Sequence, residues 1–352
     1  MKILVGMSGG VDSSVAALLL KQAGHDVIGA TMSIWDDSDT FRQLTGKGCF
    51  SSHDEDISQA KQICQNLNIP HLIVDCTDEF KQIVLNNFRN EYKAGRTPNP
   101  CVVCNSMIKF SVLPDSARKQ GIIFDKFATG HYARIHFNKA TGLYQIMRGL
   151  DSKKDQSYFL YLLTQEQLAG TILPLGEKNK FEIRELAKQA GLSVSDKPDS
   201  QDFYTGPLND ILQFPAQSGT FINKEGKILG HHNGYWNFTI GQRRGLGISA
   251  DKPLYVIDIV KESNKIIVGY ADECLQTTLT ASNWVWQIPI PQQTFHCQAR
   301  IRSSQTPVDV RLTPLSNDTF EVTFMSPQSA ITPGQSVVLN DNNMLIGGGI
   351  IN

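Results

Sequence analysis

The feature that most restricts the fold of this chain is a glycine-rich turn between an apolar strand and an apolar helix. The strand is predicted at residues 2–7, the turn and helix start at residues 8–14 (SGGVDSS), and the helix continues through residues 15–20. Glycines let a backbone approach a phosphate closely, and the N–H groups and dipole of a helix N-terminus attract anions. Asp12 adds a carboxylate of the kind that binds Mg²⁺ beside phosphates. The segment therefore predicts a phosphate site at the end of the first strand.

This turn resembles the SGGxDS loop of the ATP pyrophosphatases, which hold pyrophosphate and transfer AMP to a substrate oxygen. It does not have the GxxxxGK[ST] spacing of kinase-type loops, and it contains no lysine that could reach a γ-phosphate. A glycine turn alone is more often structural, but the flanking strand and helix favour the pyrophosphate interpretation.

Strand and helix patterns alternate through the first 200 residues, which predicts a parallel sheet with helices on both faces. In such a doubly wound α/β sheet, ligands bind at the carboxyl ends of the strands, where the turn at Ser8 lies. Further strands are predicted at residues 27–32, 71–74 and 127–129, and helices at residues 57–67, 79–92 and 181–191.

The pattern changes from about residue 218, where helical periodicity gives way to short β-branched runs separated by turns. A proline-flanked stretch at residues 287–293 is predicted to be a linker between two β units. Strands are predicted at residues 254–260, 265–268, 308–312 and 320–324. The chain is thus expected to have an ATP pyrophosphatase-like α/β domain (1–205), a small central β-rich domain (206–275) and a C-terminal β-barrel (276–352).

Composition excludes several classes of protein. The 352-residue chain has a formal net charge of −1 and no apolar run near the ~20 residues of a membrane span. No basic-then-apolar signal precedes the first strand, so a cytoplasmic location with no membrane partner is expected. Seven cysteines in a reducing compartment predict thiol chemistry or buried thiols rather than a disulfide framework.

Positive charge is concentrated in residues 81–120, where seven Lys or Arg residues face only Glu91 and Asp115. Such a local excess can attract a phosphate backbone, but it is also typical of a solvated helical face. The charge pattern alone does not separate these two interpretations.

Cys101 and Cys104 form a CxxC pair in a stiff loop with two prolines, which is where a reactive group would be presented. Arg96 and Lys109 nearby favour thiolate over thiol. A structural zinc site would need a second ligand pair, which the sequence lacks, and the prolines do not suit a thioredoxin motif. A reactive pair and a buried structural pair remain as alternatives.

Taken in order, the motifs resemble those of the tRNA-specific 2-thiouridylase family, whose members place sulfur on the wobble uridine of certain tRNAs. The resemblance runs nearly from end to end, although each segment alone is weak. The matching segments are residues 6–14, 97–100, 104–105, 128–134, 154–160, 197–201, 239–247, 327–328, 333–335 and 347–351.

The resemblance implies ATP and Mg²⁺ as ligands, tRNAs for Lys, Glu and Gln as substrates, and a persulfide or sulfide donor protein as partner. It implies an ATP site at Gly6, Met7, Ser8, Gly9, Gly10, Val11, Asp12, Ser13, Met32 and Gly130, with Asp12 also serving Mg²⁺ through the phosphates. It places the nucleophile at Cys104, target-base contacts at Asn99, Pro100 and Cys101, and tRNA contacts at His131, Lys154, Asp155, Gln156, Arg302, Ser303 and Gln335.

Two positions depart from the family pattern. The usual second cysteine, which accepts a persulfide sulfur, corresponds to Tyr204, and a position that is often aspartate is Cys101. One hypothesis is that Cys104 carries the sulfur while Cys101 acts as the resolving thiol. The other is that both cysteines and a third, such as Cys49, ligate a [4Fe–4S] cluster that binds sulfide.

The expected reaction follows from the chemistry of uridine, whose C2 oxygen is a poor leaving group. Transfer of AMP to that oxygen would release pyrophosphate, and a sulfur nucleophile would then attack the same carbon and expel AMP. Other adenylating enzymes are alternatives: glutamine-fed synthetases, tRNA lysidine synthase and NAD synthetase. A non-catalytic RNA-binding module is a further alternative, although Asp12, Ser13 and Cys104 are all present.

Overall fold

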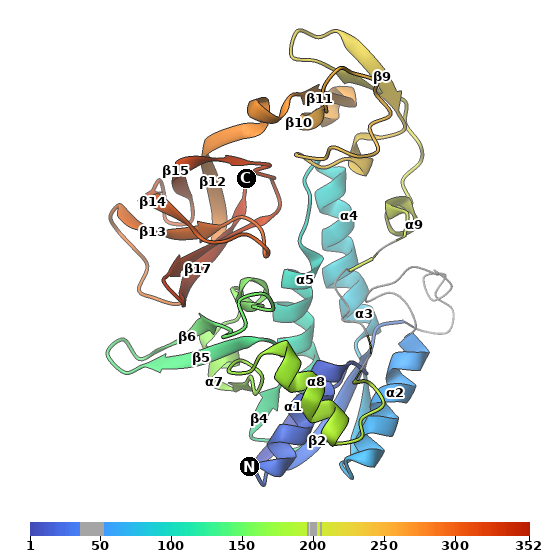
Figure 1. The fold of residues 1–352 in the computed structure, drawn as a ribbon, viewed down its shortest axis with the longest axis vertical. Coiled ribbons are helices and arrows are strands. Elements are labelled where there is room, and N and C mark those ends of the chain that lie inside the picture. Colours follow the sequence, from blue (N-terminus) through green and yellow to red (C-terminus); the bar gives the residue numbers. More distant parts are fainter. Residues whose placement is uncertain (36–52, 196, 198–202, 205) are drawn as a thin grey trace.

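The computed structural model describes residues 1–35, 53–195, 197, 203–204 and 206–352. Figure 1 shows three units: a parallel sheet with helices near the N-terminus, a small sheet at the top, and a barrel at the left. Within the described ranges, every helix is too short or too polar to span a lipid bilayer.

The N-terminal sheet has five parallel strands in the order β3-β2-β1-β4-β7. The strands predicted at residues 27–32, 71–74 and 127–129 are confirmed. β2 and β3 lie on one side of β1, and β4 and β7 lie on the other. The topological switch point of the sheet is therefore between β1 and β4, and ligands of open α/β sheets bind at such points. The strands are β1 (Lys2–Gly6), β2 (Asp26–Ser33), β3 (His71–Asp75), β4 (Lys126–Ala128) and β7 (Thr171–Ile172).

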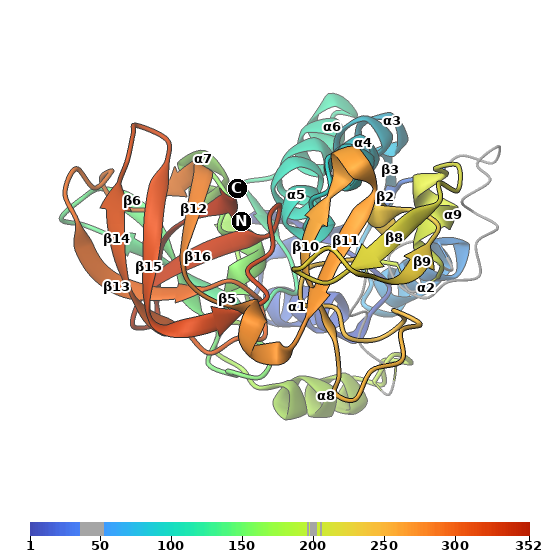
Figure 2. The same cartoon turned by 90° about the horizontal axis from the view of Figure 1, so that it is seen from above.

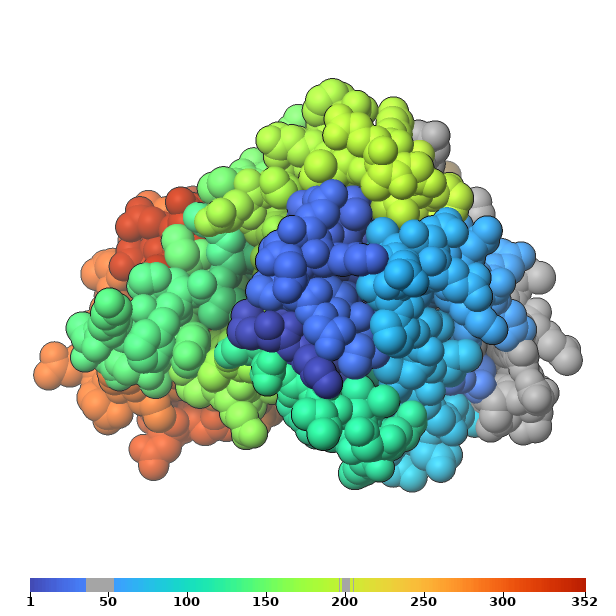
Figure 3. All heavy atoms as spheres, turned by 90° about the horizontal axis from the view of Figure 1, so that it is seen from below, coloured from blue at the N-terminus to red at the C-terminus, as the bar shows by residue number. Residues whose placement is uncertain are grey.

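Helices cover both faces of this sheet, so the predicted doubly wound α/β fold is confirmed. Side chains alternate along a strand: Ile3 and Val5 of β1 are buried in one core and Leu4 in the other. Figure 3 shows the yellow-green segment that contains α8 against the blue N-terminal segments. The helices that share a core with Ile3 and Val5 are α1 (Val11–Gln22), α2 (His53–Asn66) and α8 (Lys180–Gln189).

Two helical segments pack on the opposite face, and the second contains the cysteine pair. The first consists of α3 (Thr77–Glu79), the π-helix η2 (Phe80–Leu85) and α4 (Asn86–Lys93), which confirms the helix predicted at residues 79–92. The second, which we name the cysteine helix, consists of α5 (Pro100–Val103), the π-helix η3 (Cys104–Val112) and α6 (Leu113–Lys119).

The C-terminal unit is a closed antiparallel barrel, as predicted. Its strands follow the order β12-β15-β14-β13-β16-β17, and β17 pairs back with β12. Closure leaves no unpaired sheet edge in the ring. The strands are β12 (Leu275–Trp286), β13 (Phe295–Arg300), β14 (Val308–Pro314), β15 (Phe320–Ser329), β16 (Ser336–Asp341) and β17 (Met344–Ile351).

Two features of the barrel differ from the sequence predictions. The prediction of a linker between two β units at residues 287–293 is wrong, because these residues connect β12 to β13 of the same barrel. Gln287 is fully buried there, and its side-chain oxygen accepts a hydrogen bond from Ile146 N at 2.7 Å. In addition, the hairpin β5 (Ala133–Asn138) and β6 (Leu143–Arg148) extends the barrel sheet beside β17. This hairpin fastens the barrel to the N-terminal unit.

The central unit is a four-stranded sheet in the order β10-β11-β8-β9, beside α4 in Figure 1 and Figure 2. Its Tyr235 hydroxyl donates a hydrogen bond to Lys93 O at 2.6 Å, which ties the sheet to the end of α4. Its elements are α9 (Leu208–Leu212), β8 (Gly219–Ile222), β9 (Ile228–His232), η5 (Tyr235–Asn237), β10 (Tyr255–Val260), η6 (Lys261–Ser263) and β11 (Lys265–Gly269). The remaining short elements are η4 (Ser157–Leu160), α7 (Gln165–Ala169) and η7 (Ala271–Cys274).

Candidate active site

The predicted phosphate loop lies between the end of β1 and the start of α1. Gly9 has φ +68°, and a Cβ placed on it would lie 2.6 Å from the Asp56 carbonyl oxygen, so only glycine fits. Ser8 N donates to Ser13 Oγ at 3.2 Å, and Ser14 Oγ donates to Gly10 O at 2.7 Å. These hydroxyls fix the turn, and no described side chain caps the N-terminus of α1. The helix N-terminus is therefore presented as an anion site.

Asp12 is held by two residues that sequence analysis missed. Its Oδ1 accepts a hydrogen bond from the Tyr132 hydroxyl at 2.7 Å, and Lys180 Nζ donates to its two carboxylate oxygens at 2.7 and 2.8 Å. The carboxylate lies beside the loop, and the Lys180 ion pair would have to open for a metal ion to bind to it. Lys180 begins α8 far along the chain, and no local pattern marks it.

A second lysine, Lys197, also contacts the loop. Its Nζ donates to Gly9 O at 3.1 Å, to Asp56 Oδ1 at 2.8 Å and to Gln59 Oε1 at 2.6 Å. Its place in the matching segment 197–201 was the only sequence signal for it, and residues 198–201 lie outside the described residues. The loop contains no lysine, as the sequence indicates, but the fold places two beside it.

The residues predicted to flank adenosine lie on either side of the loop. Gly130 follows β4, and a Cβ placed on it would lie 2.6 Å from the Asp12 carbonyl carbon, so its lack of a side chain lets β4 approach α1. Met32 is half-buried near the carboxyl end of β2, the strand on the other side of β1. Their assignment to the nucleotide stays a prediction.

Asn99 and Pro100 start the cysteine helix, so the prediction that the CxxC pair lies in a stiff loop is wrong: both cysteines lie on helical backbone because a proline fits the first turn of a helix. Asn99 is the N-cap of this helix and accepts a hydrogen bond from Val102 N at 3.4 Å. Pro100 occupies the first turn, where a backbone N–H would have no partner within the helix, so proline costs no hydrogen bond there. Cys101 is half-buried and Cys104 is 7% exposed. Because they are three positions apart, with two residues between them, on continuous helical backbone, both point to one side of the helix. Cys104 opens the π-helical stretch, a geometry found often at functional sites.

His131 joins the cysteine helix to the phosphate loop. It follows Gly130, its Nδ1 lies 2.8 Å from Thr129 Oγ1, and its ring centroid lies 5.7 Å from that of Phe110 on the cysteine helix. Burial, with a smaller effect from Lys109, lowers the pKa of His131 to about 3. The imidazole is therefore neutral at physiological pH.

We expect the imidazole of His131 to show no titration between pH 5 and pH 8 in NMR spectra of the folded protein. Below about pH 6.5 the unfolded chain takes up a proton at this residue and the folded chain does not. The buried neutral imidazole therefore lowers the free energy of unfolding progressively as the pH decreases from about 6.5 to the folded-state pKa. Titration of His131 near pH 6.5 would contradict this picture.

Gln335 of the barrel holds the loop that leads to the cysteine helix. Its Nε2 donates to Thr97 O at 2.9 Å and to Pro98 O at 2.8 Å, and Thr97 N donates to Pro333 O at 2.9 Å. Gln335 is only 9% exposed. The structure thus gives it a positioning contact, and its contact with tRNA stays a prediction.

Asp155 and Gln156 are also engaged within the protein. The side chain of Asp155 is 2% exposed and pairs with Arg300 at 2.9 Å and Arg148 at 3.1 Å. Gln156 Oε1 accepts from Tyr132 N at 2.9 Å, so this segment supports the tyrosine that contacts Asp12. Lys154 is half-buried beside them. Direct tRNA contact by these three residues stays a prediction.

Tyr158 lies close to Asn99 and Arg302, two further residues predicted to contact tRNA. Its buried hydroxyl donates to Ser336 O at 2.9 Å and also hydrogen-bonds with the side chain of Asn99. Burial raises its pKa to about 12, although the nearby Arg302 lowers it in part. Arg302 itself donates to Thr332 Oγ1 at 2.7 Å, and Ser303 beside it is half-buried. The barrel thus contributes to the wall around the cysteine loop.

The described residues offer limited support for an iron–sulfur cluster. Among them, no group of three His, Cys, Asp or Glu side chains is placed to hold a metal, and the suggested third ligand, Cys49, lies outside the described residues. Tyr204, which the resemblance aligns with the second cysteine of the family, donates its hydroxyl hydrogen to Asp210 Oδ2 at 2.7 Å.

The positive charge of residues 81–120 is partly neutralised in the fold. Arg96 pairs with Glu91 at 2.5 Å and Arg118 with Asp115 at 3.0 Å. Arg89 Nε donates to Ile211 O at 3.0 Å and so ties α4 to α9. For these three arginines the structure favours the interpretation of a helical face with intramolecular partners.

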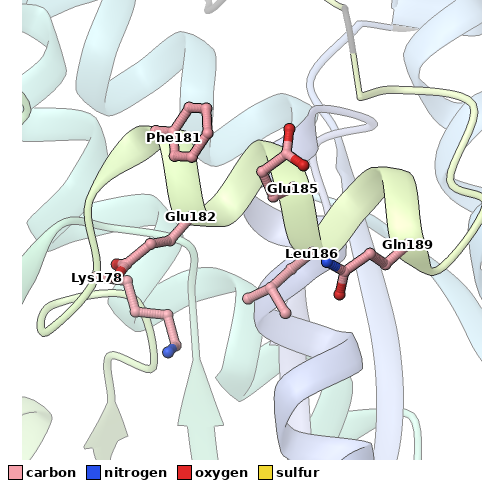
Figure 4. A pocket seen from close by; sticks show the side chains of 6 residues that line it. All are labelled: Lys178, Phe181, Glu182, Glu185, Leu186 and Gln189. Carbon is pink, nitrogen blue, oxygen red and sulfur yellow. The ribbon is translucent and has the colours of Figure 1, made fainter.

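A shallow groove of about 270 Å³ runs along α8, and Figure 4 shows the side chains that line it. None of the residues predicted for the ATP or tRNA sites belongs to it. Its lining residues are Lys178, Phe181, Glu182, Glu185, Leu186 and Gln189.

Comparison with known proteins places the chain in one family along its whole length. Family models match residues 1–204 (tRNA methyl transferase HUP domain), 208–270 (tRNA methyl transferase PRC-barrel domain) and 276–351 (aminomethyltransferase beta-barrel domain). A crystal structure of a 4-thiouridine synthetase–RNA complex with bound ATP aligns at 19% identity over 60% of this chain and 50% of that chain. Its TM-score of 0.34 is too low to support an argument.

Curated relatives match at higher identity and full length. The tRNA-specific 2-thiouridylase MnmA of Endomicrobium trichonymphae is 47% identical over 100% of this chain and 99% of the relative. A tRNA-specific 2-thiouridylase MnmA 2 of Clostridium tetani is 46% identical over 99% of this chain and 98% of the relative. That of Geotalea uraniireducens is 42% identical over 99% and 94%. With the loop, the fold and these full-length matches together, the chain belongs to the tRNA-specific 2-thiouridylase family.

Proposed function

We propose that this chain is an ATP-dependent tRNA-uridine 2-sulfurtransferase that acts on the wobble uridine. The observation that carries the proposal is that the phosphate loop and the cysteine helix adjoin each other. Phe110 of the cysteine helix packs against His131, and Gly130, the residue before His131, packs against Asp12 of the loop. Full-length relatives named tRNA-specific 2-thiouridylase support thiolation of tRNA as the reaction.

The first step would activate the uridine. Its C2 oxygen attacks the α-phosphorus of ATP, the bond to the β-phosphate breaks, and pyrophosphate leaves. The N–H groups at the start of α1, with Lys180 and Lys197 beside the loop, would stabilise the negative charge of the transition state. A bound Mg²⁺, with Asp12 as a ligand, would neutralise further phosphate charge.

The second step would replace the activated oxygen with sulfur. A persulfide donor protein would pass its outer sulfur to the Cys104 thiolate and keep a thiolate of its own. The terminal sulfur of the resulting Cys104 persulfide attacks C2, the C2–O bond breaks, and AMP leaves with the oxygen. The Cys101 thiolate then attacks Cys104 Sγ, which releases the thiocarbonyl and leaves a Cys101–Cys104 disulfide for an external thiol to reduce.

The helical spacing of the two cysteines supports this resolution step. Residues three apart on a helix have Cβ atoms about 5–6 Å apart, and a disulfide needs about 3.5–4.5 Å. A small rearrangement at the junction of α5 and η3 is therefore sufficient.

We expect purified protein with Mg²⁺ and ATP to catalyse ATP–pyrophosphate exchange only when tRNA is added. Mass spectrometry of tRNA from a strain that lacks the protein should show loss of 2-thiouridine in the tRNAs for Lys, Glu and Gln. Exchange that requires deamido-NAD would identify an NAD synthetase instead, and loss of lysidine would identify a lysidine synthase. Loss of a methyl group with 2-thiouridine intact would favour the methyl transfer that the family models name. No exchange at all would contradict adenylation.

A further inference from the structure

The matching segment at residues 239–247 has no role in the reaction described above, and it lies at a junction of all three units. Thr97, which leads to the cysteine helix, donates through its hydroxyl to Thr239 Oγ1 at 3.2 Å. On the barrel side, a Cβ placed on Gly241 would lie only 2.3 Å from Ala330 Cβ. The backbone of this segment is therefore packed directly between the cysteine loop and the barrel.

The segment is a braced turn rather than an open loop. The Gln242 side chain accepts from Thr239 N at 3.0 Å and donates to Arg244 O at 2.9 Å. Gly241 N donates to Val256 O at 2.8 Å, and Val256 N donates to Gln242 O at 3.0 Å, which anchors the turn to β10. These bonds fix the position of the two residues at the crest of the turn, Arg243 and Arg244.

Arg243 and Arg244 are both exposed, and neither forms an ion pair within the described part of the chain. This distinguishes them from Arg96, Arg118 and Arg300, which pair with Glu91, Asp115 and Asp155. A guanidinium presents a planar fork of donors that matches phosphate oxygens. Two adjacent guanidinium groups on a braced turn are therefore suited to a polyanion.

The distance of these arginines from the cysteine loop is limited by the chain itself. Thr239 touches Thr97, and Arg243 is four residues from Thr239, so the backbone path between the contact and Arg243 is at most about 14 Å. Cys101 is likewise four residues from Thr97. The turn and the cysteine pair are therefore each no more than about 14 Å of backbone from the same contact, which lets one bound RNA strand extend towards both.

We propose that Arg243 and Arg244 bind backbone phosphates of the RNA strand that flanks the reacting uridine. The proposal rests on the proposed function, because it takes RNA as the substrate. Phosphate contacts of this kind fix the register of the strand without reading its sequence. The turn would thereby set which nucleotide faces the cysteine pair.

The test is the salt dependence of tRNA binding by the full-length protein and its Arg243→Ala/Arg244→Ala variant. We expect affinity at low salt to fall on the order of tenfold for each arginine removed. The slope of log Kobs against log salt should become less steep by about 1.4, because each single-strand phosphate contact contributes about 0.7. An Arg243→Lys/Arg244→Lys variant should keep most of the slope but lose affinity, since lysine retains the charge without the fork.

Lys265→Ala is the matched control, because Lys265 is an exposed cation of the same sheet at the opposite end of the β10–β11 ladder from the turn. It should leave affinity and slope unchanged. If the double variant is unstable, the single variants Arg243→Gln and Arg244→Gln can be measured instead. Each should reduce the slope of log Kobs against log salt by about 0.7. Unchanged slope and affinity in the arginine variants, with normal binding by wild type, would overturn this proposal and leave the proposed function intact. Absence of tRNA binding by wild type would instead overturn the proposed function.

Discussion

Replacement of Cys104 by serine is expected to abolish tRNA thiolation while tRNA-dependent ATP–pyrophosphate exchange continues. The phosphate loop and its lysines would remain intact, so the adenylation step keeps its stabilising groups. Sulfur transfer needs a thiolate that can carry a persulfide, which serine cannot provide. The loss of 2-thiouridine formation should be on the order of 10³-fold or more. Both reactions can be measured on the same preparation, one by mass spectrometry of the tRNA and the other by exchange of labelled pyrophosphate.

Cys101→Ser is the matched variant, because it makes the same change three residues away on the same helix. If Cys101 is the resolving thiol, this variant should complete a single transfer and then stall with the uridine sulfur still bonded to Cys104. Full turnover by Cys101→Ser would remove the resolving role from Cys101. Loss of both exchange and thiolation in Cys104→Ser would mean that Cys104 also serves the adenylation step.

Replacement of Asp155 by asparagine is expected to destabilise the protein by about 3–5 kcal/mol, the usual cost of breaking a buried ion pair. Arg300 is 1% exposed, its Nε has no hydrogen-bond partner within the described residues, and Asp155 is its charged partner at 2.9 Å. The variant would leave this guanidinium buried beside a neutral amide. Urea unfolding followed by tryptophan fluorescence would measure the loss, since Trp284 and Trp286 lie in the same barrel.

Asp115→Asn is the control, since it breaks an Asp–Arg pair whose side chains are 56% and 54% exposed. Its cost should stay within about 1 kcal/mol. A similar cost for the two variants would contradict the structural role of the buried pair. If Asp155→Asn instead lowered only tRNA affinity, the predicted direct contact with tRNA would be favoured.

The pH dependence of the Asp155 effect provides a second check. Burial alone would raise the pKa of Asp155, but Arg300 and hydrogen bonds from Ser157 and Gly149 outweigh it and lower the pKa. A carboxyl with a lowered folded-state pKa stabilises the fold fully above its unfolded value, about 3.9, and loses that contribution as pH falls through the folded value. The stability difference between wild type and Asp155→Asn should therefore be constant near neutral pH and narrow below about pH 4.

The sequence alone was sufficient for the parallel sheet and the loop after β1, but it placed the CxxC pair in a loop, whereas the pair lies on a helix. The correct predictions depend on local signals, a glycine turn and strand and helix periodicity, whereas a proline is compatible both with a loop and with the first turn of a helix. The resemblance added candidate residues by position, but it could not tell which of them face the substrate and which hold the protein together. Asp155 and Gln335 show the difference, since both are buried and bonded within the chain.

Only the tertiary structure decided the partners of the functional side chains. Asp12 meets Lys180 across 168 residues, and Gln335 meets Thr97 across 238 residues, so no local pattern could connect them. The incorrect prediction of a linker between two β units at residues 287–293 has the same cause. A proline-flanked sequence has the same local pattern whether it joins two units or two strands of one barrel. The sequence determined the local geometry of the phosphate loop, through the backbone preferences of its glycines. The fold determined which charges surround the loop and the cysteine helix, because burial and long-range pairing exist only once the three units are packed together.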